Sequence, residues 1–356
     1  MKKIIVPIII LFILLLFIPL LSGVDNTDLL LKGQDTSSID SSSSLLDNTS
    51  SAENSVSSDV SSNENNANNT ETKNEFILLD KSNGKLIKLS EFDYVCGAVA
   101  SEMPASYGDE ALKAQAIASY TNAYRLRAIQ LQNPDPDLKG AHFDCDTSKN
   151  YGYLSWEKAK ERWGDNYETY KSKIEAAVKA VENKLLTYNG EAILAAYHAI
   201  SNGKTEKSSL YWGTDLPYLQ PVDSAYDKEA ENYQTSISIT KDELENALSE
   251  QFPSIKITGD PSSWITNLQL TDSGSVIDAQ ICNNTITGAQ LRTLLNLRSA
   301  CFTIEPQEDS ITFIVKGYGH GIGMSQYGAG RMAADGKTWE EIVKHYYTGI
   351  EITDKP

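Results

Sequence analysis

Basic residues are scarce in this chain of 356 residues. It carries 31 Lys and Arg against 48 Asp and Glu, which gives a formal net charge of −17 at pH 7 and a pI near 4.7. Nucleic acids are bound largely through their phosphates, which require a basic protein face. The charge therefore argues against nucleic acid and against electrostatic adhesion to anionic lipid, whereas a neutral or weakly charged glycan is compatible with it.

Metal-binding patterns are also missing. The chain has four histidines and no HExxH pattern, and His198 and His320 lie far apart in the sequence. His142 and Cys145 have ligand-like spacing, but two ligands are too few for a closed structural zinc site. The sequence predicts no metal and no cofactor, and leaves open a partial site at His142 and Cys145.

Only four cysteines are present, at positions 96, 145, 282 and 301. If the protein is exported, disulfides are possible, and four cysteines allow three complete pairings. Cys96 lies inside an apolar helical pattern and is expected to be a buried free thiol. The pairing of the other three stays open.

Aromatic residues are absent from residues 24–74, which are rich in Ser, Asn, Asp and Thr. Such a segment cannot bury enough apolar surface to offset its ordering entropy, so we expect a disordered linker.

Before this linker, Lys2 and Lys3 precede an apolar run of eighteen residues, Ile4 to Leu21. This run predicts a single transmembrane anchor over residues 1–23, with its lysine end in the cytoplasm and residues 75–356 on the outer side. A cleaved signal peptide is the alternative, although no clear small-residue cleavage pattern follows the run.

Residues 75–356 predict an α+β fold of helices with an antiparallel or mixed sheet. Apolar runs on both sides of Asn83-Gly84 predict a hairpin, and Ser90 is a candidate N-cap for a helix over 91–102 that ends before Pro104. Further helices are expected over 110–132 (capped by Asp109), 156–183, 241–251 and 339–347. Strands are expected over 185–188, 193–198, 255–257, 268–270 and 311–316.

Residues 317–331 read GYGHGIGMSQYGAGR, a glycine-rich segment with His, Tyr, Ser and Gln between the glycines. It lacks the GK[ST] of a phosphate-binding loop and the spacing of a dinucleotide turn. Glycine permits close approach of backbone to a ligand, so we expect a loop that grips a polar substrate. On this interpretation, Gly323→Val would impair ligand binding more than folding.

The same segment carries a resemblance to a known family. GYGHGIGMSQYGAGRMAADGKTWEEIVKHYYTGIEI resembles the C-terminal signature of the stage II sporulation protein D family. VCGAVASEMPASYGDEALKAQAIASYTNAY (95–124) resembles the Glu-Met-Pro segment of that family, and AAYHAISNGKTEKSSLYWGTDLPYLQPVDS (195–224) its Ser-x-Gly-Lys-Thr segment. The resemblance implies a peptidoglycan lytic transglycosylase, or an amidase-enhancer relative, and covers residues from about 76 to the end.

Glu102 is the acid/base that the resemblance implies. From the local sequence alone it would be a surface glutamate at a helix end, but apolar neighbours can raise a carboxyl pKa so that the group donates a proton near neutral pH. The resemblance also implies substrate contact for residues of the three segments: Lys113, Gln115, Tyr197, His198, Ser201, Gly203, Lys204, Thr205, His320, Gly321, Gly323, Ser325, Gln326 and Tyr327.

The chain departs from the family pattern at Tyr120, where members often have an arginine. Arg125 or Arg127 could replace it. The departure keeps open a non-enzymatic, wall-binding amidase enhancer, while a glycosidase with two carboxylates would need a second acid among Asp109, Glu110, Asp144 and Asp146. The partners that the resemblance implies are glycan strands, preferably stripped of peptides, a sporulation amidase and membrane partners of the engulfment complex.

Overall fold

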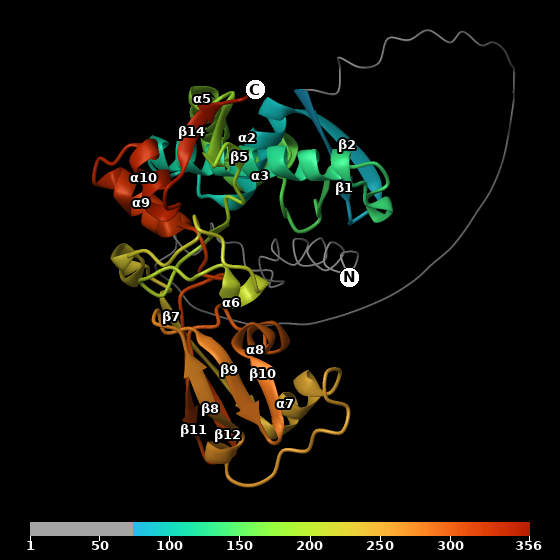
Figure 1. Cartoon of the computed structure of the whole chain (residues 1–356), viewed down its shortest axis with the longest axis vertical. Coiled ribbons are helices and arrows are strands. Elements are labelled where there is room, and N and C mark those ends of the chain that lie inside the picture. Colours follow the sequence, from blue (N-terminus) through green and yellow to red (C-terminus); the bar gives the residue numbers. More distant parts are fainter. Residues whose placement is uncertain (1–73) are drawn as a thin grey trace, which may run out of the picture. The chain divides into compact units, whose positions relative to one another are not determined.

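A computed structural model describes residues 74–356 (Figure 1). The membrane anchor and the linker predicted over residues 1–73 lie outside the described residues. Between residues 74 and 356, no helix is both long and apolar enough to span a membrane. The described residues mix helices with several small sheets, so the predicted α+β class is confirmed.

The described residues begin with the predicted hairpin of β1 (Glu75–Asp80) and β2 (Lys85–Ser90), which pair antiparallel. Ser90 caps α2 (Glu91–Glu102) by accepting a hydrogen bond from the Asp93 N–H at 3.0 Å. The helix ends because Met103 is extended before Pro104, as expected for a residue that precedes proline. This end of α2 places Glu102 at the surface of the helical core.

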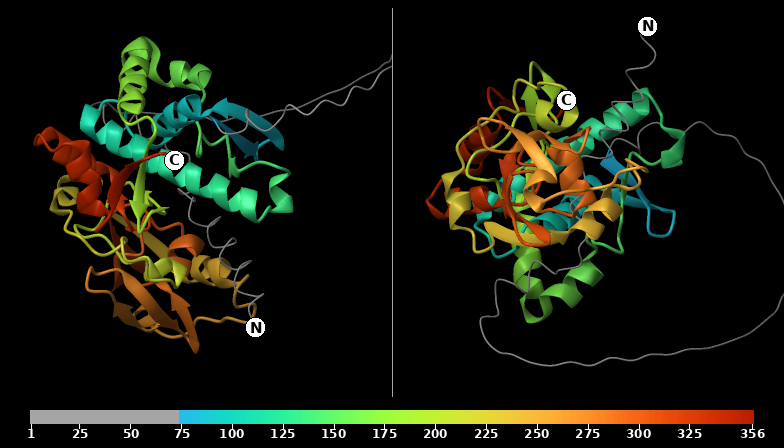
Figure 2. Two further views of the ribbon diagram at one scale, coloured as in Figure 1. Left: turned by 45° about the horizontal axis from the view of Figure 1, so that its top comes forward. Right: turned by 90° about the horizontal axis from the view of Figure 1, so that it is seen from below.

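The long helix α3 (Asp109–Gln132) runs through the helix-rich part of the molecule (Figure 2). Most of its first half is buried. Gly108 is its N-cap, so Asp109 is the first helical residue and not the predicted cap. Around α3 pack α2, α5 (Tyr167–Ala180), α9 (Gln326–Ala334) and α10 (Trp339–Tyr346). A continuous helix predicted over 156–183 is wrong, because Gly164, with φ of +50°, separates α4 (Trp156–Trp163) from α5.

The rest of the helix-rich part consists mainly of short strands. The elements are β3 (Phe143–Cys145), β4 (Lys184–Tyr188), β5 (Glu191–Ala192), β6 (Tyr197–His198), β13 (Met324–Ser325) and β14 (Glu351–Asp354), with the single-turn α6 (Ser209–Trp212). β3 pairs parallel with β1, and β13 pairs parallel with β6. The second pairing brings the glycine-rich segment against residues 196–201. Only Tyr197–His198 of the strand predicted over 193–198 is observed.

A second hydrophobic core holds a β-rich part between residues 234 and 316, drawn below the helices in Figure 1. Two three-stranded antiparallel sheets, β10-β9-β8 and β11-β12-β7, enclose it. The elements are β7 (Gln234–Thr240), α7 (Lys241–Leu248), β8 (Ile265–Leu270), β9 (Val276–Ile281), β10 (Asn284–Thr287), α8 (Gly288–Leu294), β11 (Phe302–Pro306) and β12 (Ser310–Lys316). The strand predicted over 255–257 is wrong: these residues have no regular structure, although Ile255 and Ile257 are buried in the core.

Candidate functional site

Glu102 lies at the C-terminal end of α2 and is partly buried. Burial raises the pKa of its carboxyl group to about 7, against the opposing effect of hydrogen bonds from the Gly152 backbone and the Ser101 side chain. A carboxyl group with this pKa is protonated in a large fraction of molecules near neutral pH. It can therefore give up a proton and take it back, as a general acid and base must.

Three tyrosines lie close enough to Glu102 to sense its charge. Burial and then the negative charge of Glu102 raise the pKa values of Tyr94, Tyr151 and Tyr197 above the ordinary value for tyrosine. All three hydroxyls therefore stay protonated and can donate hydrogen bonds beside the carboxyl group. Tyr197 was predicted from the sequence. Tyr94 and Tyr151 were missed, because their positions depend on the fold and not on any local pattern.

A cleft lies between α3 and residues 133–152. Its lining includes the three tyrosines, Ser119, and Gly152, whose backbone hydrogen-bonds the Glu102 carboxyl group. Ligand sites are usually apolar with a few polar groups that orient the ligand. The cleft thus presents the hydroxyl donors of the three tyrosines that sense the charge of Glu102.

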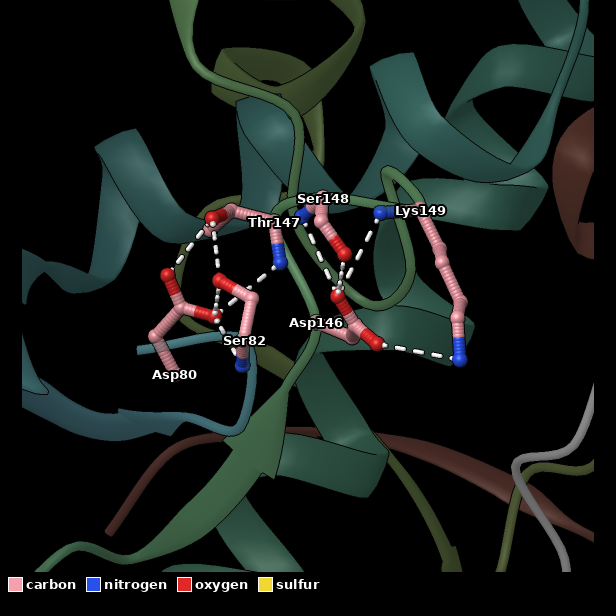
Figure 3. Close-up of polar contacts among 6 residues, drawn as sticks. All are labelled: Asp80, Ser82, Asp146, Thr147, Ser148 and Lys149. Atoms are coloured by element: carbon pink, nitrogen blue, oxygen red, sulfur yellow. Dashed lines mark hydrogen bonds and ion pairs between the residues drawn. The ribbon is translucent and has the colours of Figure 1, made fainter. Parts of the chain in front are cut away.

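Residues 146–149, which lead into Tyr151 and Gly152, form a turn that is held by the carboxylates of Asp80 and Asp146 (Figure 3). The carboxylate of Asp80 accepts hydrogen bonds from the backbone and hydroxyl of Ser82 (3.0 and 2.7 Å) and from the backbone of Thr147 (3.2 Å). Burial would raise the pKa of Asp80, but these hydrogen bonds outweigh it and lower the pKa to about 2. Asp146 in turn exchanges two backbone hydrogen bonds with Tyr151, at 3.1 and 2.9 Å. The β1–β2 turn therefore anchors the segment that contacts Glu102.

Two glutamines hold the three helices around Glu102 in place. The side-chain amide of Gln326, on α9, donates to the Glu102 backbone carbonyl at 2.9 Å and to Gln115 Oε1 at 3.2 Å. Gln115, on α3, donates to the Ser119 hydroxyl at 3.1 Å. Both glutamines are buried, so the structure assigns them a positioning role, and their predicted contact with substrate stays a prediction.

Ser201 and Ser325 meet at a buried aspartate that the sequence did not single out. Asp227 accepts hydrogen bonds from the Ser325 hydroxyl (2.7 Å), the Ser201 backbone (2.7 Å) and the Ser224 hydroxyl (3.0 Å). Burial raises the pKa of Asp227, and these hydrogen bonds oppose the rise. Ser325 also caps α9 by accepting from the Gly328 N–H at 3.1 Å, so the predicted loop over 317–331 becomes helical from Gln326.

His198 and His320 form a pair whose ring centroids are 5.7 Å apart. His198 is buried, and its Nδ1–H donates to the Ile322 carbonyl at 3.1 Å, while its Nε2 has no partner among the described residues. His320 Nδ1 accepts from the Ile322 N–H at 3.0 Å. Burial lowers both pKa values, that of His198 to about 4, so both rings are neutral at physiological pH.

The glycines of this segment serve the packing of the protein's own backbone. Gly323 has φ of +72°, and a Cβ there would lie 2.1 Å from the Ala196 carbonyl oxygen. At Gly319, with φ of +114°, a Cβ would lie 2.8 Å from the Cβ of His198. The expectation that Gly323→Val would impair ligand binding more than folding is contradicted by this packing, because the close approach is to residues 196–198 of the protein itself.

The remaining predicted site residues divide between exposed and internal positions. Lys204 is exposed, and Tyr327 and Gly321 are partly exposed. Lys113 pairs with Glu110 at 2.6 Å, Thr205 is buried against Val222, and Gly203 donates to the Ser201 hydroxyl at 3.0 Å. These placements leave the substrate contacts of Lys204 and Tyr327 as predictions.

Neither arginine near Tyr120 turns toward Glu102. Arg127 pairs with Glu91 at 2.8 Å, and Arg125 donates to the Ala192 carbonyl at 3.3 Å. The Tyr120 hydroxyl itself donates to Glu91 at 2.8 Å. Arg125, Arg127 and Tyr120 therefore all form contacts away from Glu102.

The cysteines and the His142 region show no ligand cluster. All four cysteines are free thiols, and Cys96 is buried as expected. His142 Nδ1 accepts a hydrogen bond from the Ile77 N–H at 3.1 Å. Within residues 74–356 there is no group of three or more His, Cys, Asp or Glu side chains that could hold a metal. The absence of a metal stays a prediction.

Comparison with known proteins places this geometry in context. Residues 81–188, which include Glu102 and the anchored turn, match a family described as Stage II sporulation protein. The chain is 40% identical over 266 residues to stage II sporulation protein D of Bacillus subtilis (strain 168), covering 74% of each chain. It is 36% identical over 273 residues to the protein of that name from Bacillus amyloliquefaciens, covering 77% of each.

A more distant similarity extends to a protein with a different name. The chain is 28% identical over 306 residues to a protein named amidase enhancer from Bacillus subtilis (strain 168). The match covers 72% of this chain and 40% of that protein.

Proposed function

Because the chain belongs to the stage II sporulation protein D family, we propose that residues 75–356 cleave peptidoglycan glycan strands as a lytic transglycosylase during endospore engulfment. The observation that carries this proposal is the partly buried carboxyl of Glu102, whose pKa is raised to about 7 near a cleft lined by Tyr94, Tyr151 and Tyr197. No second carboxylate is needed for this reaction.

The reaction uses Glu102 twice. Its protonated carboxyl donates a proton to the glycosidic oxygen that links C1 of N-acetylmuramic acid to the next sugar, and the C1–O bond breaks. The carboxylate then takes the proton of the muramoyl C6 hydroxyl as that oxygen attacks C1. One strand ends in a 1,6-anhydro sugar and the other in a free hydroxyl. No water is consumed, and Glu102 is protonated again.

The surroundings suit this cycle. The hydroxyls of Tyr94, Tyr151 and Tyr197 stay protonated, so they can hold sugar oxygens without competing for the proton. The Gly152 N–H, which bonds the carboxylate, stabilises the charged form that exists between the two proton transfers. The turn anchored at Asp80 keeps Tyr151 and Gly152 at fixed positions.

The four acids considered for a hydrolase are each paired or hydrogen-bonded, and of these four only Asp144 lines the cleft beside the three tyrosines. Asp144 pairs with Lys81, and Asp146 pairs with Lys149 at 3.4 Å. Asp109 lies 3.7 Å from Lys173, and Glu110 accepts from the Trp339 N–H at 2.7 Å. These contacts favour a single-acid mechanism over one with two carboxylates.

The similarity to an amidase enhancer supports a second candidate, a domain that binds the wall and stimulates an amidase without cleaving glycan. The position of Tyr120, which bonds Glu91 and not the cleft, is compatible with it. We also propose an N-terminal membrane anchor, an outward-facing domain, and a partner amidase that strips the stem peptides.

Cleavage of peptide-stripped strands by the full-length protein and by Glu102→Gln tests the proposal. Gln keeps the shape of Glu but cannot deliver a proton, and general acid–base catalysis contributes about 10²–10⁴-fold. Cleavage should fall by at least that factor while binding persists. Wild-type activity should decline as pH rises through about 7, where Glu102 loses its proton. An active variant would remove Glu102 from the mechanism, and binding without cleavage by the wild type would favour the enhancer.

A further inference from the structure

The junction between the helix-rich and β-rich parts gathers cations in a protein with a formal net charge of −17. A small cavity at this junction is lined by Lys204 of the Ser-x-Gly-Lys-Thr segment, Lys316 at the end of β12, and Tyr211 and His320. Arg292, on α8, donates hydrogen bonds to the Tyr211 hydroxyl and, through Nε, to the Arg298 carbonyl at 3.3 Å. Three cationic side chains therefore converge from different elements.

None of these cations has an acidic partner. Among the described residues, no carboxylate lies within 4.0 Å of the charged nitrogens of Arg292, Lys204 or Lys316. A guanidinium has five N–H donors, and these two bonds leave Arg292 with donors to spare. Partly buried cations are usually paired, so the unpaired Arg292 and Lys316, with the exposed Lys204 beside the same cavity, point to a ligand that brings its own negative charge.

The acid that lines the same cavity is already engaged. Glu206 is buried, and its carboxyl accepts hydrogen bonds from the Thr271 hydroxyl at 2.9 Å and from Ser275. These bonds tie the turn between β8 and β9 to the Ser-x-Gly-Lys-Thr segment, which closes one wall of the cavity. The Glu206 carboxyl is held mainly by these neutral donors; the charge of Lys204 also opposes the rise that burial causes in its pKa, although the two groups form no ion pair within 4.0 Å.

The cation cluster is connected to the proposed acid/base by direct contacts. The Tyr211 ring centroid lies 6.3 Å from that of His320, and His320 is hydrogen-bonded to the backbone of Tyr197. Tyr197 is one of the three tyrosines that sense the charge of Glu102. These contacts place the cation cluster within a few side chains of Glu102.

We infer that Arg292, Lys316 and Lys204 form a subsite for a carboxylate, namely the free lactyl carboxylate of muramic acid from which the stem peptide has been removed. This inference rests on the proposed function. In intact peptidoglycan the same lactyl group is a neutral amide, which offers no charge to the cations. The subsite thus provides a physical reason for a preference for peptide-stripped strands.

A matched pair of ligands tests the subsite. Peptide-free glycan strands carry lactyl carboxylates, and treatment of the same strands with ammonia and a carbodiimide converts them to neutral amides. Binding is measured by calorimetry with the full-length protein carrying Glu102→Gln, so that no cleavage intervenes. Hydrogen bonds to charged groups contribute about 1.5–3 kcal/mol, so the carboxylate form should bind at least about tenfold more tightly, and added salt should reduce the difference.

Two variants and a control decide the outcome. Arg292→Gln and Lys316→Gln should each remove most of the preference, and Arg292→Lys should keep part of it. Lys241→Gln, which removes an exposed charge from α7 of the same β-rich part, should keep all of it. Equal binding of both ligands by the parent protein, or a full preference in both glutamine variants, would overturn the subsite. Because binding is read without cleavage, an inactive wild type would overturn the proposed function and leave this test valid.

Discussion

Replacement of Glu102 by Gln should make the protein more stable in mildly alkaline solution. The native state raises the pKa of this carboxyl from 4.5 to about 7, chiefly through burial. One pKa unit corresponds to about 1.4 kcal/mol, so the ionised group costs the native state about 3 kcal/mol above the native pKa. Gln has no charge to bury and still offers an oxygen to the Gly152 N–H, so it should avoid this cost.

The sign of the pH dependence follows from the raised pKa. Between 4.5 and about 7 the native carboxyl keeps a proton that the unfolded chain has released, so the wild type loses stability as pH rises through this window. Near pH 4, Glu102→Gln and wild type should therefore be about equally stable. At about pH 8 the variant should be more stable by about 3 kcal/mol, or roughly 6–12 °C in Tm.

Urea unfolding at the two pH values measures the difference, and Glu110→Gln is the control. The pKa of Glu110 is lowered, because hydrogen bonds from Lys113 and the Trp339 N–H outweigh its burial. Its replacement should therefore destabilise the protein at about pH 8 and have little effect at low pH. A Glu102→Gln variant that is no more stable than wild type at about pH 8 would show that the native site does not penalise the charge.

Three further changes test other parts of the account. Gly323→Ala should destabilise the protein far more than Gly190→Ala, although both glycines have similar φ (+72° and +79°), because a Cβ at Gly323 meets the Ala196 oxygen at 2.1 Å and one at Gly190 meets nothing within 4 Å; equal Tm losses would contradict the packing argument. Asp80→Asn should cost about 2 kcal/mol at neutral pH, and the difference should vanish as pH falls from 3.8 through about 2, where wild-type Asp80 gains its proton; a pH-independent difference in urea unfolding would refute this. The full-length chain should fractionate with membranes and retain residues 1–23, and a soluble mature chain beginning near Val24 in N-terminal sequencing would refute the anchor.

Local signals predicted the elements that surround Glu102. Asn83-Gly84 between apolar runs specifies a hairpin, and Ser90 and Pro104 mark the two ends of α2. These signals need only neighbouring residues, so the sequence places Glu102 at a helix end. What the sequence alone does not reveal is whether that end is buried, and the resemblance to the family supplied the reason to choose it.

Much of the β-rich part was missed because strands such as β7 contain few apolar residues. Gln234–Thr240 is rich in Ser and Thr, and of its seven side chains only Ile239 is buried. Ile255 and Ile257 suggested a strand, but they enter the second core from an irregular segment. Burial in these cases is decided by packing across the fold and not by local periodicity.

The surroundings of Glu102 were partly predictable. The three family segments do meet, since Gln326 bonds both Gln115 and the Glu102 carbonyl, and β13 pairs with β6. Tyr151 could not be predicted, because its position depends on a turn that Asp80 holds from 67 residues away along the chain. From the sequence, the glycines of 317–331 were interpreted as ligand-binding glycines. Only the fold shows that Gly317, Gly319 and Gly323 pack against residues 196–201, where a Cβ atom would clash.

The chemical nature of the cleaved end tests the central claim most directly. Peptide-stripped glycan strands are digested with the full-length protein in water enriched in oxygen-18, and the new ends are analysed by mass spectrometry. A single acid/base at Glu102 predicts 1,6-anhydro ends that have gained neither the mass of water nor oxygen-18, and their disappearance in Glu102→Gln. Ends that carry oxygen-18 and reduce would contradict the account, because water would then be the nucleophile and a second carboxylate would have to activate it.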